Sequence, residues 1–126
     1  MTDSKNEIIA TLGKGGVFDI TTSGRKSKQP HRIEIGYHVI DGRLYISGMP
    51  MPRRRSWLAN LDADQAFTLH LRKPPPRDVA ARARIIDTDA ERRSLMPHIA
   101  SNWGRKDVET MVAQSPLIEV SIEPPG

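Results

Sequence analysis

Two clusters of basic residues carry the clearest chemistry in this chain of 126 residues. The first lies in TTSGRKSKQPHR, residues 21–32, a segment without an acid. Its cations are Arg25, Lys26, Lys28 and Arg32. The second cluster consists of Arg53, Arg54 and Arg55 and directly precedes Ser56. A helix beginning at Ser56 would add free backbone N–H groups and a positive dipole end, so both clusters predict binding of a phosphate or a polyanionic tail.

The basic character of the chain is local. Residues 21–60 hold eight Lys or Arg against the two acids Glu34 and Asp41, whereas the net charge of the whole chain is +4. A local excess of positive charge favours a site for a discrete anion. A solubilising surface is the alternative interpretation.

Other chemistries find little support. Cysteine is absent, which excludes thiolate catalysis and Cys-based metal sites. The four histidines, His31, His38, His70 and His98, show neither HxxxH nor HxH spacing, so we predict no metal site. Ser23 and Ser47 lie in no GxSxG motif, and GKGG at 13–16 lacks the spacing of a phosphate-binding loop. The apolar GMPM at 48–51 could lie against a flat ring.

Alternating apolar residues predict most of the elements. Strands are expected at 17–22, 32–40, 44–47, 67–71, 79–86 and 117–123. Asp41–Gly42 predicts a two-residue hairpin turn between the second and third of them. Short helices are expected over the first dozen residues and at 57–63, with Ser56 as the cap of the latter.

A further helix is expected from Thr88. Thr88 and Glu91 have the spacing of a capping box, and Leu95, Ile99 and Trp103 follow at helical spacing. Pro97 is expected to kink or split this helix, and a second helical stretch follows at 107–114. Hairpin-linked strands with short helices favour a small antiparallel barrel, with an open α+β sandwich as the alternative. A doubly wound parallel fold is disfavoured, because strands do not alternate regularly with long helices.

Three segments, TTSGRKSKQPHRIEI, DGRLYISG and SWLANL, resemble the deazaflavin-dependent nitroreductase family of the flavin-binding split-barrel superfamily, which is similar to pyridoxamine phosphate oxidase. The resemblance covers roughly residues 17–122, and T-x-G-R-K-S and W-x-x-N-L are its most specific parts. It implies a mainly β (α+β) fold: a six-stranded antiparallel split β-barrel with short helices, in one domain over residues 1–126. It also implies coenzyme F-420 (8-hydroxy-5-deazaflavin), whose tail carries phosphate and glutamates, with FMN as the alternative.

The resemblance further implies a set of cofactor-binding residues. Arg25 and Lys26 match the basic pair that binds the tail, and Arg32, with His31 as the alternative, matches the basic residue after Q-P. Ser47 matches the strand-end serine at the ring system, and Asn60 matches the asparagine of W-x-x-N-L. The whole set is Arg25, Lys26, Arg32, Ser47, Gly48, Met49, Arg54, Arg55, Ser56, Trp57 and Asn60.

The chain departs from the family pattern in two respects. Lys28 stands where the family usually has glycine, and the only tyrosines are Tyr37 and Tyr45. These two tyrosines and water are the candidate proton donors. Family members that reduce nitroimidazoles have tyrosines near the C-terminal substrate pocket, so we do not expect nitroimidazole activity here.

The resulting hypothesis is an oxidoreductase that transfers a hydride from reduced deazaflavin to a small unsaturated or nitro-type organic acceptor. An FMN-binding split-barrel oxidoreductase and a non-catalytic cofactor-binding protein are the alternatives. Nucleic acid is an unfavourable partner, because two Trp, two Tyr and two Phe supply few stacking side chains. The N-terminal segment has no apolar run long enough for a signal peptide or membrane span, so a cytoplasmic protein is expected, and split barrels suggest a homodimer.

Overall fold

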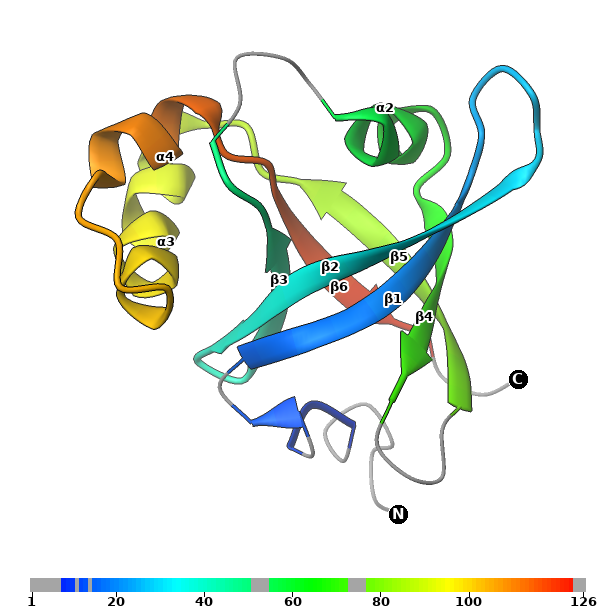
Figure 1. The fold of residues 1–126 in the computed structure, drawn as a ribbon, viewed down its shortest axis with the longest axis horizontal. Coiled ribbons are helices and arrows are strands. Elements are labelled where there is room, and N and C mark those ends of the chain that lie inside the picture. Colours follow the sequence, from blue (N-terminus) through cyan, green and yellow to red (C-terminus); the bar gives the residue numbers. More distant parts are fainter. Residues whose placement is uncertain (1–7, 11, 14, 51–54, 73–76, 124–126) are drawn as a thin grey trace.

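Six antiparallel strands form a closed barrel in a computed structural model that describes residues 8–10, 12–13, 15–50, 55–72 and 77–123. The strands are β1 (Gly15–Ser23), β2 (Pro30–Ile40), β3 (Arg43–Ser47), β4 (Ala66–Leu71), β5 (Arg77–Ile85) and β6 (Leu117–Ile122). Their order around the barrel is β1-β2-β3-β6-β5-β4, and β1 pairs with β4 to close it (Figure 1). The predicted antiparallel barrel is confirmed, and closure excludes the open sandwich.

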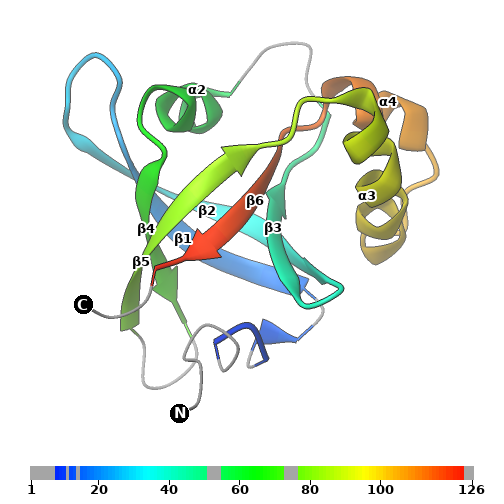
Figure 2. The ribbon, with the colours of Figure 1, turned by 180° about the vertical axis from the view of Figure 1, so that it is seen from behind.

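Three helices pack around the barrel at two places. Helix α2 (Ser56–Ala63) lies across one end, beside the hairpin formed by β1 and β2 (Figure 1). Helices α3 (Asp89–Asn102) and α4 (Val108–Gln114) lie together outside the barrel, on the side of β3 (Figure 2). The short helical segment near the N-terminus lies by the opposite end from α2. The β1–β2 turn and α2 therefore share one end of the molecule.

The apolar residues form two cores. The first fills the barrel and contains Phe18, Ile20, Leu44, Ile46, Leu61, Leu69 and Ile118, each at most 1% exposed. The second lies between the outer surface of the barrel and the two outer helices. It contains Tyr45, Ile86, Met96, Ile99, Met111 and Leu117, among others. Ile118, Val120 and Ile122, which alternate along β6, are all buried.

The predicted hairpin between β2 and β3 is confirmed. Ile40 pairs with Arg43 and Val39 with Leu44, which leaves Asp41 and Gly42 as the two turn residues. Their φ angles are 52° and 73°, both in the left-handed region that a type I′ turn requires. This turn fixes the register of the two strands.

The capping box predicted for α3 is wrong. Thr88 occupies the N-cap position, but its side chain makes no capping hydrogen bond. The Glu91 carboxylate instead accepts from Arg84 Nη1 of β5 at 3.0 Å, because the neighbouring strand offers it a cation. The helix also runs unbroken through Pro97, so the predicted split does not occur.

Arg92 fastens the two outer helices to the end of the barrel. Its guanidinium donates to four carbonyl oxygens, those of Ile86 at 2.9 Å, Val112 at 2.7 Å, Met111 at 3.2 Å and Ser115. Three of these carbonyls belong to the end of α4 and the residue after it, where backbone donors run out: the Met111 carbonyl also accepts from the Ser115 N–H at 2.9 Å. Burial lowers the pKa of Arg92, and the carbonyls replace the water that it loses.

Candidate functional site

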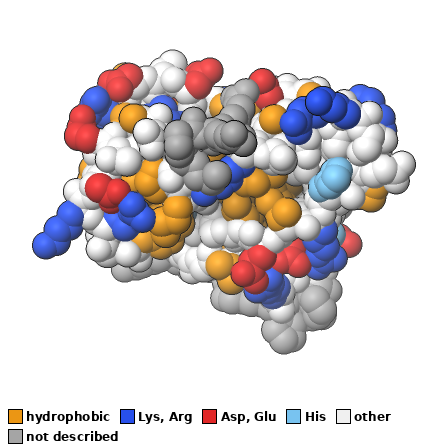
Figure 3. Space-filling view, turned by 45° about the horizontal axis from the view of Figure 1, so that its top comes forward, with side chains coloured by type: hydrophobic (Ala, Val, Ile, Leu, Met, Phe, Trp, Pro, Cys, Tyr) orange, Lys and Arg blue, Asp and Glu red, His pale blue; other side chains and the backbone are white. Residues whose placement is uncertain are grey.

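A pocket of ≈ 650 Å³ lies between the β1–β2 turn and α2. Its lining residues are Thr22, Gly24, Arg25, Lys26, Ser27, His31, Ile33, Arg55, Ser56, Trp57 and Asn60. Figure 3 looks onto this end of the molecule, where hydrophobic side chains gather and Lys and Arg side chains stand beside them. Such a pocket can hold a molecule that has a flat apolar part and an anionic part.

Asn60 joins the turn to the helix. Its Nδ2 donates to Thr22 Oγ1 at 3.1 Å, and its Oδ1 accepts from the backbone N–H of Arg25 at 3.2 Å and from Arg25 Nη1 at 3.0 Å. Asn60 is 4% exposed and Thr22 is 1% exposed. One buried amide therefore fixes both the backbone and the guanidinium of Arg25.

The turn itself is tight. The backbone N–H of Lys28 donates to the Gly24 carbonyl at 2.9 Å, and the N–H of Gly24 donates to the Gln29 carbonyl at 2.8 Å. A Cβ on Gly24 would lie 2.5 Å from Ser27 Oγ and 2.7 Å from His31 Nε2, so a larger residue here would displace these two side chains. Lys28 has a φ of 62°, a left-handed conformation that costs a non-glycine residue about 1–2 kcal/mol.

The cations of the pocket have different surroundings. Arg25 and Lys26 are exposed, and no ion pair joins either of them to an acid among the residues that the structure describes. Arg55 is half-buried, and burial lowers the pKa of its guanidinium. Arg55 is also the N-cap of α2, so Ser56 is the first helical residue and the prediction of Ser56 as the cap is wrong by one position.

Six of the predicted cofactor-binding residues come together in this pocket: Arg25, Lys26, Arg55, Ser56, Trp57 and Asn60. Arg54 lies outside the described residues. Ser47, Gly48 and Met49 do not line the pocket. Ser47 is 1% exposed and its Oγ donates to the Pro116 carbonyl at 2.6 Å, so this hydroxyl fastens β3 to the start of β6. Met49 is 45% exposed, and its Sδ lies 2.8 Å from Arg105 Nη1.

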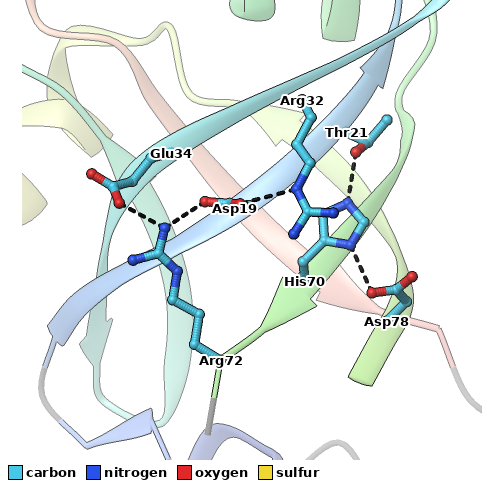
Figure 4. Close-up of polar contacts among 7 residues, drawn as sticks. All are labelled: Asp19, Thr21, Arg32, Glu34, His70, Arg72 and Asp78. Atoms are coloured by element: carbon cyan, nitrogen blue, oxygen red, sulfur yellow. Dashed lines mark hydrogen bonds and ion pairs between the residues drawn. The ribbon is translucent and has the colours of Figure 1, made fainter. Parts of the chain in front are cut away.

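Arg32 lies on the other face of the β1–β2 ribbon. Its Nε donates to Asp19 Oδ2 at 2.9 Å, and Arg72 binds Asp19 and Glu34 at 2.6 Å each (Figure 4). The geometry therefore separates Arg32 from the cations of the pocket. His31, the alternative, lines the pocket together with Ile33.

His70 lies in the same polar cluster and joins three strands. One ring nitrogen is 2.6 Å from Thr21 Oγ1 of β1 and the other is 2.7 Å from Asp78 Oδ1 of β5 (Figure 4). The sequence of hydroxyl, imidazole and carboxylate in Thr21, His70 and Asp78 is the one found in a hydrolytic triad. However, the hollow of ≈ 490 Å³ beside it is lined by Arg32, His70, Leu71, Arg72, Arg77 and Asp78, and Thr21 is not among them. We interpret the cluster as a structural one that joins β1, β4 and β5 and stabilises the closed barrel.

The two tyrosines lie away from the pocket. Tyr37 stacks on Phe18 with 4.5 Å between ring centroids, and its hydroxyl donates to the Leu12 carbonyl at 2.9 Å. Tyr45 is 4% exposed in the core beneath the outer helices. Burial raises the pKa of both hydroxyls. Neither tyrosine is placed to donate a proton in the pocket.

Two further features are absent from the described part of the chain. No group of three or more His, Asp or Glu side chains in that part is arranged to hold a metal ion. None of the helices among these residues is long and apolar enough to cross a membrane.

Solved structures define the fold class. The chain is similar to a conserved hypothetical protein from Mycobacterium tuberculosis, with a TM-score of 0.73, 17% identity, and coverage of 98% of this chain and 81% of that one. HutZ, the heme storage protein of Vibrio cholerae, has a TM-score of 0.67 and 10% identity over 97% of this chain and 90% of its own. An F420-H2 dependent reductase, FDR-A, has a TM-score of 0.61 and 16% identity over 83% of this chain and 93% of its own. At these identities the likeness shows a split barrel and no more.

The family follows from the sequence. The model of the family described as F420H(2)-dependent quinone reductase matches residues 2–124, so the chain belongs to that family. The protein is therefore a reductase that depends on coenzyme F-420, and the deazaflavin resemblance is confirmed. No curated protein matches the sequence.

The pocket fits this coenzyme. Arg25 and Lys26 are cations without an acidic partner in the described segments, as a tail of phosphate and carboxylates requires. Trp57, 7% exposed, and Ile33 supply an apolar surface for a planar ring. The residues that sequence reasoning missed are Thr22, Gly24, Ser27 and Ile33.

Proposed function

We propose that this reductase transfers a hydride to a quinone-type acceptor, with coenzyme F-420 bound in the pocket between the β1–β2 turn and α2. The observation that carries the proposal is a pair of exposed cations, Arg25 and Lys26, that form no ion pair with a described acid and lie beside the apolar surface of Trp57. Buried Asn60 holds Arg25 in place. The family description, which names a quinone reductase, supports the acceptor class.

The side chains divide the work of binding. Arg25 and Lys26 bind the anionic tail, and Asn60 holds Arg25 ready for it, which reduces the entropy lost on binding. Trp57 and Ile33 pack against the ring system and exclude water from one face of it. When bound in its reduced form, the coenzyme supplies the hydride. The final proton comes from water, because the hydroxyls of Tyr37 and Tyr45 are buried elsewhere.

Titration with coenzyme F-420 and with FMN, side by side, tests the cofactor assignment. We expect tight binding of F-420 and weak binding of FMN. Arg25→Gln and Lys26→Gln should each weaken F-420 binding about ten- to a hundredfold, because a charge-assisted contact contributes about 1.5–3 kcal/mol. Lys28→Gln removes a neighbouring charge that does not line the pocket and is the matched control.

A panel of acceptors tests the substrate class. Wild-type protein with reduced F-420 should oxidise the coenzyme rapidly when a benzoquinone or naphthoquinone is added. Nitroaromatic and simple unsaturated acceptors should react more slowly. Faster reduction of a nitroaromatic than of every quinone would refute the acceptor class and leave the cofactor assignment standing.

A homodimer remains a prediction for this chain. One solved structure that the chain resembles, with a TM-score of 0.63 and 16% identity over 83% of this chain, is described as a domain-swapped dimer. Light scattering during size-exclusion chromatography decides the question. A mass of 14.1 kDa would correspond to a monomer.

A further inference from the structure

Arg55 differs from the other cations of the pocket. Arg25 is exposed and tied to Asn60, and Lys26 is exposed. Arg55 is half-buried, and within the described ranges its guanidinium makes neither a hydrogen bond nor an ion pair. Burial with no compensating partner lowers its pKa. A guanidinium that loses part of its water without gaining a partner is costly, and such a group at the edge of a pocket indicates a site for an anion.

Gly48 provides the space that the guanidinium occupies. A Cβ on Gly48 would lie 3.1 Å from both Cζ and Nη1 of Arg55 and 3.1 Å from Cγ of Pro116. Gly48 has no left-handed φ, so a larger residue here is opposed by close packing and not by backbone conformation. The backbone of Arg55 is also fixed, since its carbonyl accepts from the Ala59 N–H at 3.0 Å in the first turn of α2. The guanidinium therefore lies beside Gly48, directly after β3, at one side of the pocket.

The two arginines lie at different positions along α2: Arg55 is the N-cap of the helix, and Arg25 contacts Asn60 within it. Arg25 binds Asn60, five residues after Arg55, a separation of about 7.5 Å along the helix axis. An anionic tail is fully charged before it binds and suits the exposed cations of the turn. A half-buried cation acts more strongly than an exposed one on charge that appears during a reaction, because water screens it less.

We propose that Arg55 is a catalytic residue of this reductase: its guanidinium binds the acceptor oxygen that becomes negative when a hydride is added. This proposal rests on the proposed function and extends it from the coenzyme to the acceptor. Gly48 is the positioning residue, because it leaves room for the guanidinium.

The chemistry balances with one reductant and one proton. The quinone receives a hydride, which is one proton with two electrons, and the reduced coenzyme is oxidised. The hydride bonds to one quinone oxygen, the π electrons shift through the ring, and the electron pair of the opposite carbonyl double bond moves onto the second oxygen, so the product is a hydroquinone monoanion. Arg55 holds this oxygen and keeps its own proton, since an arginine remains charged. One proton from water then completes the hydroquinone.

Arg55→Gln and Arg55→Lys are the variants, and Lys28→Gln, which removes a charge outside the pocket, is the matched control. Three quantities are measured: the Kd for F-420, kcat for a benzoquinone at saturating coenzyme, and the pH at which bound 4-nitrophenol ionises, read from its absorbance. The phenol mimics the anionic product and needs no turnover. Circular dichroism verifies that each variant is folded.

In Arg55→Gln, kcat should fall by about a hundredfold while the Kd for F-420 changes by less than about threefold. Wild type should bind 4-nitrophenol and lower the pH at which it ionises, and Arg55→Gln should abolish this shift. Arg55→Lys should recover part of kcat, because the charge remains but the planar fork does not.

Opposite results overturn the proposal. A large rise in the Kd for F-420 with kcat unchanged would make Arg55 another coenzyme-binding cation. Unchanged kcat and an unchanged phenol shift would give Arg55 no role in either step. Failure of the wild-type protein to bind F-420 or to reduce any quinone would instead refute the proposed function. Because this result needs no variant, it is distinguished from a failure of the proposal for Arg55.

Gly48→Ala provides a second, independent test. The added Cβ must displace the guanidinium, and a flexible side chain can move at little cost in stability. We expect kcat to fall by about tenfold in the wild-type background and not to change further in Arg55→Gln, because the two residues then act through the same contact. An equal fall in both backgrounds would show that Gly48 acts independently of Arg55.

Discussion

Truncation of Asn60 to alanine should separate stability from preorganisation of the pocket. The change removes one donor to Thr22 Oγ1 and one acceptor for both the backbone N–H and the Nη1 of Arg25. These contacts span 35 residues or more of sequence and are the ones that tie the turn to α2. The variant therefore tests the central element of the pocket.

The magnitude follows from which groups can reach water. Arg25 is exposed, so its donors can bind water after the change, and their loss costs little. Thr22 is 1% exposed, and its Oγ1 would remain buried without the Nδ2 donor. An unsatisfied buried group costs about 1–3 kcal/mol, and the cavity left by the amide adds about 1 kcal/mol. We expect the free energy of unfolding to fall by about 3 kcal/mol.

Binding should weaken for a separate reason. Without Asn60, the coenzyme must order the Arg25 side chain and the turn, at about 0.5–1.5 kcal/mol for the side chain and about as much for the backbone. The Kd for F-420 should therefore rise about tenfold. Urea unfolding and fluorescence titration measure the two effects.

Asn102→Ala is the matched control for this truncation. Its Nδ2 contacts His38 Nδ1 at 2.9 Å, and it does not line the pocket. It should lower stability and leave the Kd unchanged. A stable Asn60→Ala variant with wild-type affinity would refute the assigned role of Asn60.

Three other predictions address the scaffold. Burial lowers the pKa of His38 to about 4, below its usual 6.5. Between these two pH values the unfolded chain binds a proton at His38 and the folded protein does not, so the free energy of unfolding falls as the pH drops from about 6.5 towards 4. Urea unfolding should lose about 2 kcal/mol between pH 7 and pH 5 through this group, a loss absent in His38→Leu. Lys28→Gly should raise the free energy of unfolding by about 0.5–1 kcal/mol by relieving the left-handed φ of 62°, with unchanged F-420 affinity; a destabilised variant would contradict this. Arg92→Met should cost about 3 kcal/mol or more in thermal unfolding, because it removes the guanidinium that donates to the Val112 and Ser115 carbonyls at the end of α4, and a neutral effect would show that water replaces it.

The sequence predicted those structural features that depend on residues close together along the chain. The β2–β3 hairpin follows from strict alternation and from Asp41–Gly42, which adopts the left-handed pair of φ angles. The capping box at Thr88 failed, although its spacing is correct, because Glu91 has a second option in Arg84. A local motif cannot predict a partner that the closing of the barrel supplies.

The alternation of β2 distinguishes Arg32 from His31 as a residue of the pocket. Alternation places Ile33 and Ile35 on one face of β2, and His31 shares that face by the same period of two. Arg32 shares the opposite face with Glu34, where Asp19 and Arg72 meet them. The strand pattern therefore favoured His31 for the pocket, whereas matching residue types along a motif favoured Arg32.

The spacing of W-x-x-N-L has a physical meaning in this structure. Residues three apart lie on the same side of a helix, so Trp57 and Asn60 both face the pocket from α2, while Leu61 enters the barrel core at 0% exposed. Trp57 contributes surface to the pocket, and Asn60 contributes the position of Arg25. The two motifs, one in the turn and one in the helix, therefore form a single unit, because the guanidinium of the first depends on the amide of the second.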